Sequence, residues 1–376
     1  MCAITTVMAI IFALAIDANA AELPAKIGVV GSFSGNSYYY TKQNLEGAQL
    51  AVKEINAAGG LLGRQVELLI EDDQDRPDIS TTKARKLTDA GVVALLSFGS
   101  TASVLQNQRV ALETHTPEIC GNYGDSVTTK LDNPFMFQIG ATASQQLAML
   151  LQFASGKFNK AALITDNSAT GQDTGKAFRD GLQKAGLSIV AEQTVEVGTT
   201  DVTPQLQRLR AANPEAVFQS GMSIAEMALF FRNYRQLGLS YPVLASGNVA
   251  SPAYLELAPN MLNGVYYADI IDPRKPQLQA VFAGIEKEFK HPALGWEPVG
   301  YDGVMLFANA IKNAGSFDKD KIQQQLINTK NFIGSEVANG KGYSFSPNRR
   351  VGFPDDGVVI RMIENNKHGP VVYPPS

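Results

Sequence analysis

Residues 26–73 are the part of this chain that most restricts its fold. Residues 26–33 are short, apolar and β-branched, as a strand buried on both faces of a sheet should be, and a Ser-Gly pair follows them. Across residues 41–58 apolar side chains recur at helical spacing until a Gly-Gly pair ends the pattern. Residues 66–70 return to strand character, so the segment predicts a strand–helix–strand unit.

Strand-like and helix-like segments alternate along most of the remaining chain. The predicted strands cover residues 92–98, 116–120, 135–139, 161–165, 188–197, 216–219 and 242–245. The predicted helices cover residues 101–113, 143–155, 170–185, 202–212 and 224–237. This alternation predicts parallel sheets with helices on both faces. Because the strands are too many for one doubly wound domain and the chain has 376 residues, we expect two such sheets.

The composition is that of a globular chain with a full core, with 45% hydrophobic and 18% charged residues. The formal net charge is −4, and the sequence contains no basic run and no low-complexity tract. These features argue against nucleic acid and against an anionic membrane surface as partners.

Residues 1–20 have the pattern of a cleaved signal peptide, with an apolar run at residues 7–16 and an Ala-Asn-Ala site at residues 18–20. No Lys or Arg precedes the run, so a misassigned start or a short membrane anchor is the alternative, although the run is too short to span a bilayer. The signal predicts a periplasmic protein. Cys2 would leave with it, so Cys120 is expected to be a buried thiol with no disulfide partner.

The first unit resembles the type I periplasmic solute-binding proteins of ABC transporters, in the branch that binds leucine, isoleucine and valine. The residues that carry the resemblance are Ser34-Gly35, Gly47-Ala48, Leu50-Ala51, Glu54-Ile55-Asn56-Ala57, Gly59-Gly60 and Gly63-Arg64. The resemblance implies an α/β fold of two doubly wound parallel-sheet lobes, joined by a three-segment hinge near residues 140–143, 269–272 and 331–335. We expect residues 21–141 and 270–332 in lobe 1, residues 142–269 and 333–376 in lobe 2, and the ligand site at the strand ends between them.

Ser100 and Thr101 are the strongest ligand candidates, because they follow a predicted strand and open a predicted helix. A hydroxyl beside free N–H groups at a helix N-terminus suits a carboxylate, and a plain N-cap is the alternative. In the resembled family the Ser/Thr at this turn binds the ligand's carboxylate, helped by the segment that here contains Asn122 and Tyr123. The resemblance also places Tyr40 where an aromatic residue covers the ligand; a surface aromatic loop is the alternative.

The second half departs from the family's amino-acid site. Thr170 and Met222 stand where members often carry Tyr, and Asn248 lies in the segment where they carry an acidic partner for the substrate's ammonium. A buried ammonium without a charged partner costs several kcal/mol. We therefore expect a ligand with a carboxylate or amide but no α-ammonium, such as an aromatic or other organic acid. A carboxylate elsewhere in the cleft would restore the amino-acid interpretation. Asp302 is one candidate, although the resembled family often has a structural Asp at this place.

Metal, cofactor and catalytic chemistry find little support in the sequence. The acidic run at residues 71–75 lacks the spacing of a calcium loop, and His115, His291 and His368 are widely separated. We find no phosphate-binding glycine loop and no nucleophile elbow, and we expect Phe98 and Trp296 in the core or the cleft wall. The chain is predicted to bind no metal or cofactor and to catalyse no reaction.

The resemblance implies a monomeric receptor that captures a small solute by lobe closure and delivers it to an ABC permease in the inner membrane. Aromatic or other organic acids are the favoured ligands, and a branched-chain amino acid or amide is the alternative. A ligand sensor of the same fold, which feeds a regulator instead of a transporter, is the alternative from another class.

Overall fold

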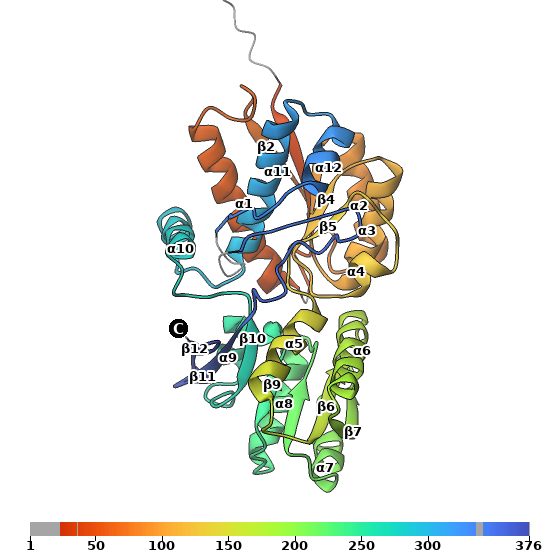
Figure 1. The fold of residues 1–376 in the computed structure, drawn as a ribbon, viewed down its shortest axis with the longest axis vertical. Coiled ribbons are helices and arrows are strands. Elements are labelled where there is room, and N and C mark those ends of the chain that lie inside the picture. The colour runs from red at the N-terminus through yellow and green to blue at the C-terminus, as the bar shows by residue number, and fades with distance from the viewer. Residues whose placement is uncertain (1–22, 36, 336–340, 376) are drawn as a thin grey trace, which may run out of the picture.

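The computed structural model describes residues 23–35, 37–335 and 341–375, which form two lobes, each built around its own β-sheet (Figure 1). The predicted signal peptide lies outside these residues. Within the described part of the chain, no helix has both the length and the apolar character needed to cross a membrane.

The first sheet has the strand order β2-β1-β3-β4-β5, and all its neighbouring strands are parallel. Its strands are β1 (Ala25–Gly31), β2 (Val66–Asp72), β3 (Ala94–Phe98), β4 (Glu118–Cys120) and β5 (Met136–Gln138). Strand β3 is buried along its whole length, as expected for a central strand covered by helices on both faces.

The helices of the first lobe come from two distant parts of the chain, which lie together in the upper half of Figure 1. They are α1 (Tyr38–Ala57), α2 (Pro77–Asp89), α3 (Thr101–Glu113), α4 (Ser126–Thr129), α10 (Pro276–Phe289), α11 (Glu297–Ala314) and α12 (Lys319–Ile327). Helices α1 and α11 pack closely: a Cβ atom at Gly47 would lie 1.8 Å from the backbone oxygen of Glu297. The glycine of the Gly47-Ala48 motif therefore permits this helix contact.

The second sheet has the order β12-β11-β10-β9-β8-β6-β7. Its strands are β6 (Lys160–Asp166), β7 (Ser188–Val195), β8 (Ala216–Gln219), β9 (Val243–Ala245), β10 (Tyr266–Asp269), β11 (Val359–Glu364) and β12 (Lys367–Tyr373). Strands β6 to β10 pair in parallel, whereas β11 pairs antiparallel with both β10 and β12. The hairpin between β11 and β12 turns at Asn365 and Asn366, which both have positive φ.

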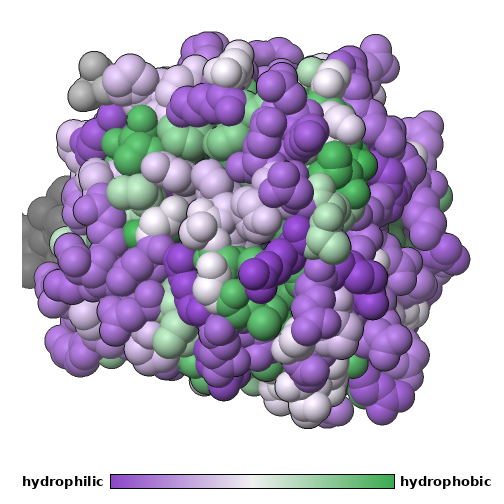
Figure 2. Space-filling view, turned by 90° about the horizontal axis from the view of Figure 1, so that it is seen from below, coloured by the Kyte–Doolittle hydropathy of each residue, from purple (hydrophilic) through white to green (hydrophobic). Residues whose placement is uncertain are grey.

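The remaining helices belong to the second lobe in the lower half of Figure 1. They are α5 (Ala143–Ala154), α6 (Ala169–Lys184), α7 (Thr203–Ala211), α8 (Ile224–Gln236), the 3-10 helix η1 (Gly247–Ala250) and α9 (Pro252–Leu257). Viewed from below, this lobe presents a mainly hydrophilic face in which hydrophobic residues show in separate groups (Figure 2).

The fold class predicted from the sequence is confirmed, with the antiparallel hairpin β11–β12 as an unpredicted edge of the second sheet. Cys120 is buried, as predicted, and it forms no disulfide within the described residues. Residues 335 and 351 contact the first lobe: Ser335 hydrogen-bonds Asp302, and Val351 forms a bridge with Gln138 of β5. From the sequence we expect the chain to pass into lobe 2 near residues 331–335, whereas these contacts with lobe 1 lie at or beyond that point. The lobe boundaries stay a prediction.

Candidate functional site

A cleft of about 190 Å³ lies between the two lobes, at the carboxyl ends of strands from both sheets. The first lobe lines it with Ser37, Tyr40, Thr41, Asn44, Asp75, Ser97, Phe98, Gly99, Ser100, Gly121, Asn122, Tyr123 and Trp296. The second lobe lines it with Ser168, Thr170, Val197, Gly221, Met222, Ser223, Ile224 and Asn248. For comparison, an apolar cavity of about 150 Å³ holds one benzene molecule, so this cleft has room for one small solute.

The cleft brings together most of the residues predicted to bind ligand, and contact with a ligand stays a prediction for all of them. Those that line it are Tyr40, Ser100, Asn122, Tyr123, Thr170, Met222 and Asn248. Thr101 is buried beside the cleft; its Oγ1 donates to Asn122 Oδ1 at 3.0 Å and accepts from Thr170 Oγ1 at 3.2 Å. Thr101 therefore positions two lining side chains, one from each lobe.

The N-terminus of α3 offers hydrogen-bond donors to the cleft. Ser100 is the N-cap and also lines the cleft; its Oγ accepts from the backbone N–H of Ser103 at 3.3 Å. The backbone N–H of Thr101 has a long 3.5 Å contact to Thr170 Oγ1. Unsatisfied N–H groups and the positive end of the helix dipole favour an anionic group here.

In the second lobe, the carboxylate of Asp166 pairs with the residues that precede two helices, α6 and α8. Ser168 caps α6, and both its N–H and its Oγ donate to Asp166 Oδ1, at 3.1 and 2.6 Å. The N–H of Ser223, which precedes α8, donates to Asp166 Oδ2 at 2.9 Å. Asp166 lies fully buried at the end of β6. Both serines were missed as site residues, although each follows a predicted strand and precedes a predicted helix.

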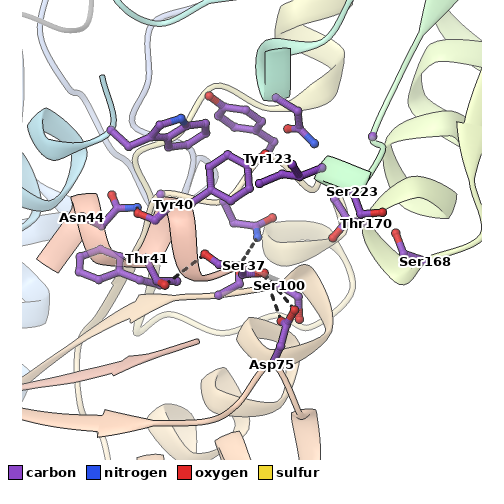
Figure 3. A pocket seen from close by; sticks show the side chains of 18 of the residues that line it. Ser37, Tyr40, Thr41, Asn44, Asp75, Ser100, Tyr123, Ser168, Thr170 and Ser223 are labelled. Carbon is purple, nitrogen blue, oxygen red and sulfur yellow. Dashed lines mark hydrogen bonds between the residues drawn. The ribbon is translucent and has the colours of Figure 1, made fainter. Parts of the chain in front are cut away.

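Aromatic side chains form one wall of the cleft. The Trp296 ring lies 5.1 Å from the Tyr40 ring and 5.0 Å from the Tyr123 ring, measured between ring centroids. Tyr123 and Trp296 are each 7% exposed, and burial raises the pKa of Tyr40 and of Tyr123, so both hydroxyls stay protonated. Figure 3 shows the Tyr40 and Tyr123 rings above Ser37 and Ser100.

Two buried polar atoms in this wall have no hydrogen-bond partner among the described residues: Asn44 Oδ1 and Trp296 Nε1. Asn44 Nδ2 donates to the backbone oxygen of Tyr40 at 2.8 Å, which fixes the orientation of the amide and leaves its oxygen free. A buried donor or acceptor without a partner costs about 1–3 kcal/mol. A bound solute that paired with these atoms would remove that cost.

Asp302 does not lie in the cleft, so its candidacy as an ammonium partner is wrong. Its Oδ1 accepts from the N–H of Ser335 at 2.6 Å, and its Oδ2 accepts from Ser335 Oγ at 2.8 Å and from Tyr343 Oη at 2.9 Å. Burial raises its pKa to about 6. Asp75 is instead the one carboxylate among the described lining residues, which include no Lys, Arg or His.

Comparison with known protein families finds a match to the model described as "Periplasmic binding protein", over residues 24–359. Leu/Ile/Val-binding protein homolog 3 from Brucella melitensis is 25% identical over 358 residues, with 92% of this chain and 95% of that protein covered. The Leu/Ile/Val-binding protein of Escherichia coli K12 is 26% identical, with 72% of this chain and 76% of that protein covered.

Solved structures share the fold. A branched-chain amino acid substrate-binding protein from Streptococcus pneumoniae, in complex with isoleucine, has a TM-score of 0.79 at 23% identity, with 93% and 99% of the two chains covered. A solute-binding protein of an ABC transporter from Rhodopseudomonas palustris BisB5, in complex with 3,4-dihydroxybenzoic acid, has a TM-score of 0.77 at 24% identity, with 91% and 93% covered.

Proposed function

The chain belongs to the periplasmic binding protein family, and we propose that it captures a small carboxylate-bearing solute in its interlobe cleft for an ABC importer. Membership confirms the resemblance predicted from the sequence, and it agrees with the prediction that the chain is not an enzyme, because members of this family are solute-binding proteins. Periplasmic location, action as a monomer and delivery to a permease in the inner membrane are parts of the proposal.

The observation that carries the proposal is the contrast between the helix N-termini at the cleft. The carboxylate of Asp166 accepts from the N–H groups of Ser168 and Ser223, the N-cap residues of α6 and α8. At α3 the N-cap Ser100 lines the cleft, and the N–H of Thr101 has only the long contact to Thr170 Oγ1. The ligand's carboxylate is therefore assigned to the N-terminus of α3. The unpaired N–H of Trp296 is a further donor for an acidic or hydroxylated ligand.

The body of the ligand would lie against the aromatic wall. Tyr40, Tyr123 and Trp296 offer ring faces and edges, and aromatic pairs prefer the offset or edge-on contacts that such a wall permits. The facing wall from the second lobe contains neutral side chains, among them Met222 and Asn248. These features favour an aromatic or other organic acid, and the Rhodopseudomonas palustris protein with bound 3,4-dihydroxybenzoic acid is a precedent for such a ligand in this fold.

A branched-chain amino acid is the second candidate. The names of the relatives favour it, and so does Asp75, because a carboxylate in the lining is a possible partner for an ammonium group. A sensor that reports solute to a regulator stays the alternative from another class.

Binding would be coupled to closure of the lobes. In the structure Tyr40 Oη lies 2.8 Å from Tyr254 Oη, and the N–H of Ser126 donates to Asp173 Oδ2 at 3.1 Å, each pair joining the two lobes. A solute that contacts both walls adds to these contacts, so it stabilises the closed form and excludes water.

The test is calorimetric titration of the protein from residue 21 onward with benzoate-type acids, aliphatic acids, amides and branched-chain amino acids. We expect dissociation constants in the micromolar range for one class of acid, and at least a tenfold loss in Tyr40→Ala. Tyr38→Ala is the matched control, because Tyr38 is 40% exposed and lies outside the lining. Binding of amides alone, or of no compound in the panel, would contradict the proposed ligand class.

A further inference from the structure

Asp75 is a carboxylate at the floor of the cleft, in the loop after β2. Its backbone has a φ of 59°, directly after Gln74 at 56°, so consecutive left-handed residues turn the chain there. Figure 3 shows the Asp75 side chain pointing up toward Ser37 and Ser100. Nothing in the sequence pattern indicates this position.

The carboxylate of Asp75 accepts few hydrogen bonds from neighbouring side chains. Ser37 Oγ lies 3.2 Å from both Asp75 oxygens, and Ser32 Oγ lies 3.2 Å from Oδ1. Each hydroxyl has one proton, and that of Ser32 is nearer to Asp73 Oδ1, at 2.8 Å. An ionised carboxylate has about four acceptor positions, so these hydroxyl protons leave part of the acceptor capacity of Asp75 unused.

No positive side chain compensates this charge from within the cleft, because the described lining residues include no Lys, Arg or His. Burial raises the pKa of Asp75, and nearby Asp73 adds to the shift, while the hydroxyls of Ser37, Ser32 and Ser100 oppose it. An acid bound beside Asp75 would bring two carboxylates together unless the acid also carried a hydrogen-bond donor between them.

Ser100 determines where that donor must be. Ser100 and Asp75 both line the cleft, with the Asp75 side chain pointing toward Ser100 (Figure 3), and Ser100 is also the N-cap of α3, where the proposed carboxylate site lies. A ligand whose carboxylate is at α3 therefore has its adjacent atom, and not its far end, nearest to Asp75.

We infer that Asp75 is a specificity-determining residue that accepts a hydrogen bond from a donor group next to the ligand's carboxylate. The ligand class is then an acid with a hydroxyl or an ammonium on the carbon beside the carboxylate, and its remaining part packs against Tyr40, Tyr123 and Trp296. The inference rests on the proposed function and narrows it. The sequence indicates no acidic partner for an ammonium group in the second lobe, and Asp75 would provide such an acceptor from the first lobe.

Two matched series test this assignment. Phenylacetate, mandelate and phenylglycine differ only in bearing hydrogen, hydroxyl or ammonium on the α-carbon, and 4-methylpentanoate, 2-hydroxy-4-methylpentanoate and leucine form the aliphatic equivalent. Calorimetric titration should give at least about tenfold tighter binding for one substituted acid than for its unsubstituted parent, since hydrogen bonds to charged groups contribute about 1.5–3 kcal/mol. Preference for the hydroxyl or for the ammonium identifies the donor.

Asp75→Asn provides the second arm. The amide removes the negative charge and presents a donor, so the preference should fall to less than about threefold while the unsubstituted parent binds as well as before or better. A substitution that merely disturbed the fold would also weaken binding of the unsubstituted parent acid. Asp78→Asn is the matched control, because Asp78 is exposed, pairs with Arg76 and lies outside the lining.

The outcomes separate the two proposals. Equal binding of all members of a series to the wild-type protein overturns the role of Asp75 and leaves the proposed function standing, whether or not the variant folds. Failure of every acid to bind overturns both. A preference that persists unchanged in Asp75→Asn assigns the donor to another residue and also overturns the inference.

Discussion

The hydroxyl oxygens of Tyr40 and Tyr254 lie 2.8 Å apart, although Tyr40 belongs to α1 of the first lobe and Tyr254 to α9 of the second. Tyr254 Oη also contacts the backbone oxygen of Met222 at 3.3 Å. Because Tyr40 and Met222 both line the cleft, this tyrosine pair links closure of the lobes to the shape of the ligand site.

Tyr40→Phe should therefore weaken ligand binding by about three- to tenfold, because one hydrogen bond contributes about 0.5–1.5 kcal/mol. The free energy of unfolding should change little, since Tyr254 keeps Met222 as a partner. Titration with the best ligand, together with urea unfolding, measures both quantities. An unchanged affinity would mean that the pair plays no part in closure. Tyr38→Phe is the control for loss of an exposed hydroxyl.

Trp296→Phe should lower the affinity for the ligand while changing the free energy of unfolding little. The Nε1 atom is buried without a partner among the described residues, so removing it relieves a desolvation cost that offsets the packing lost with the larger ring, and the free energy of unfolding of the ligand-free protein should change by less than about 1 kcal/mol. Affinity for the ligand should fall by about fivefold if this N–H donates to it. A loss of stability with no loss of affinity would assign the indole a purely structural role.

Glu118→Gln should change how stability depends on pH. Glu118 is fully buried in β4, and burial raises its pKa from 4.5 to about 8, partly opposed by the hydroxyl of Ser97, which donates to Oε1 at 2.5 Å. Between these values the unfolded chain releases the proton and the folded chain keeps it, so the free energy of unfolding falls as pH rises.

Across the range from about pH 5 to pH 8 this effect amounts to about 3 kcal/mol. The amide has no proton to release, so the stability of Glu118→Gln relative to the wild type should rise by that amount over the same range. Urea unfolding at both ends of the range measures it. A constant difference between the two proteins would show that Glu118 does not titrate in this interval.

Gly47→Ala should lower the free energy of unfolding by more than about 2 kcal/mol, because its Cβ would lie 1.8 Å from a backbone oxygen that cannot move without shifting α11. The matched control is Gly284→Ala in α10, whose Cβ would meet the side-chain atom Leu50 Cδ2 at 2.8 Å. That side chain can rotate, and alanine favours the helix, so the control should cost less than about 1 kcal/mol. Equal costs would contradict the tight α1–α11 contact.

Much of the fold could be predicted because local pattern and tertiary position agree. The helix at residues 101–113 was predicted with the bounds it has, since Ser100 caps it and its periodicity ends at Thr114. The hairpin β11–β12 was missed, because its two strands meet at a pair of asparagines and pair antiparallel at the edge of an otherwise parallel sheet.

The site was predictable only where residues follow strand ends. Ser100, Asn122 and Met222 lie in the cleft because the carboxyl ends of parallel strands meet there. Asp75 reaches the cleft through consecutive left-handed residues, and the acidic run that contains it gave no sign of that turn. The candidate Asp302 failed because its carboxylate faces Ser335 and Tyr343, which are distant in the sequence, and local pattern does not reveal such contacts.

A crystal structure of the protein with its best-binding acid tests the central claim most directly. The account predicts the ligand between the lobes, its carboxylate within hydrogen-bond distance of Ser100 Oγ and the first N–H groups of α3, and its apolar part against Tyr123 and Trp296. A ligand bound outside this cleft, or one whose carboxylate lies at the second-lobe wall beside Ser168 and Ser223, would contradict it.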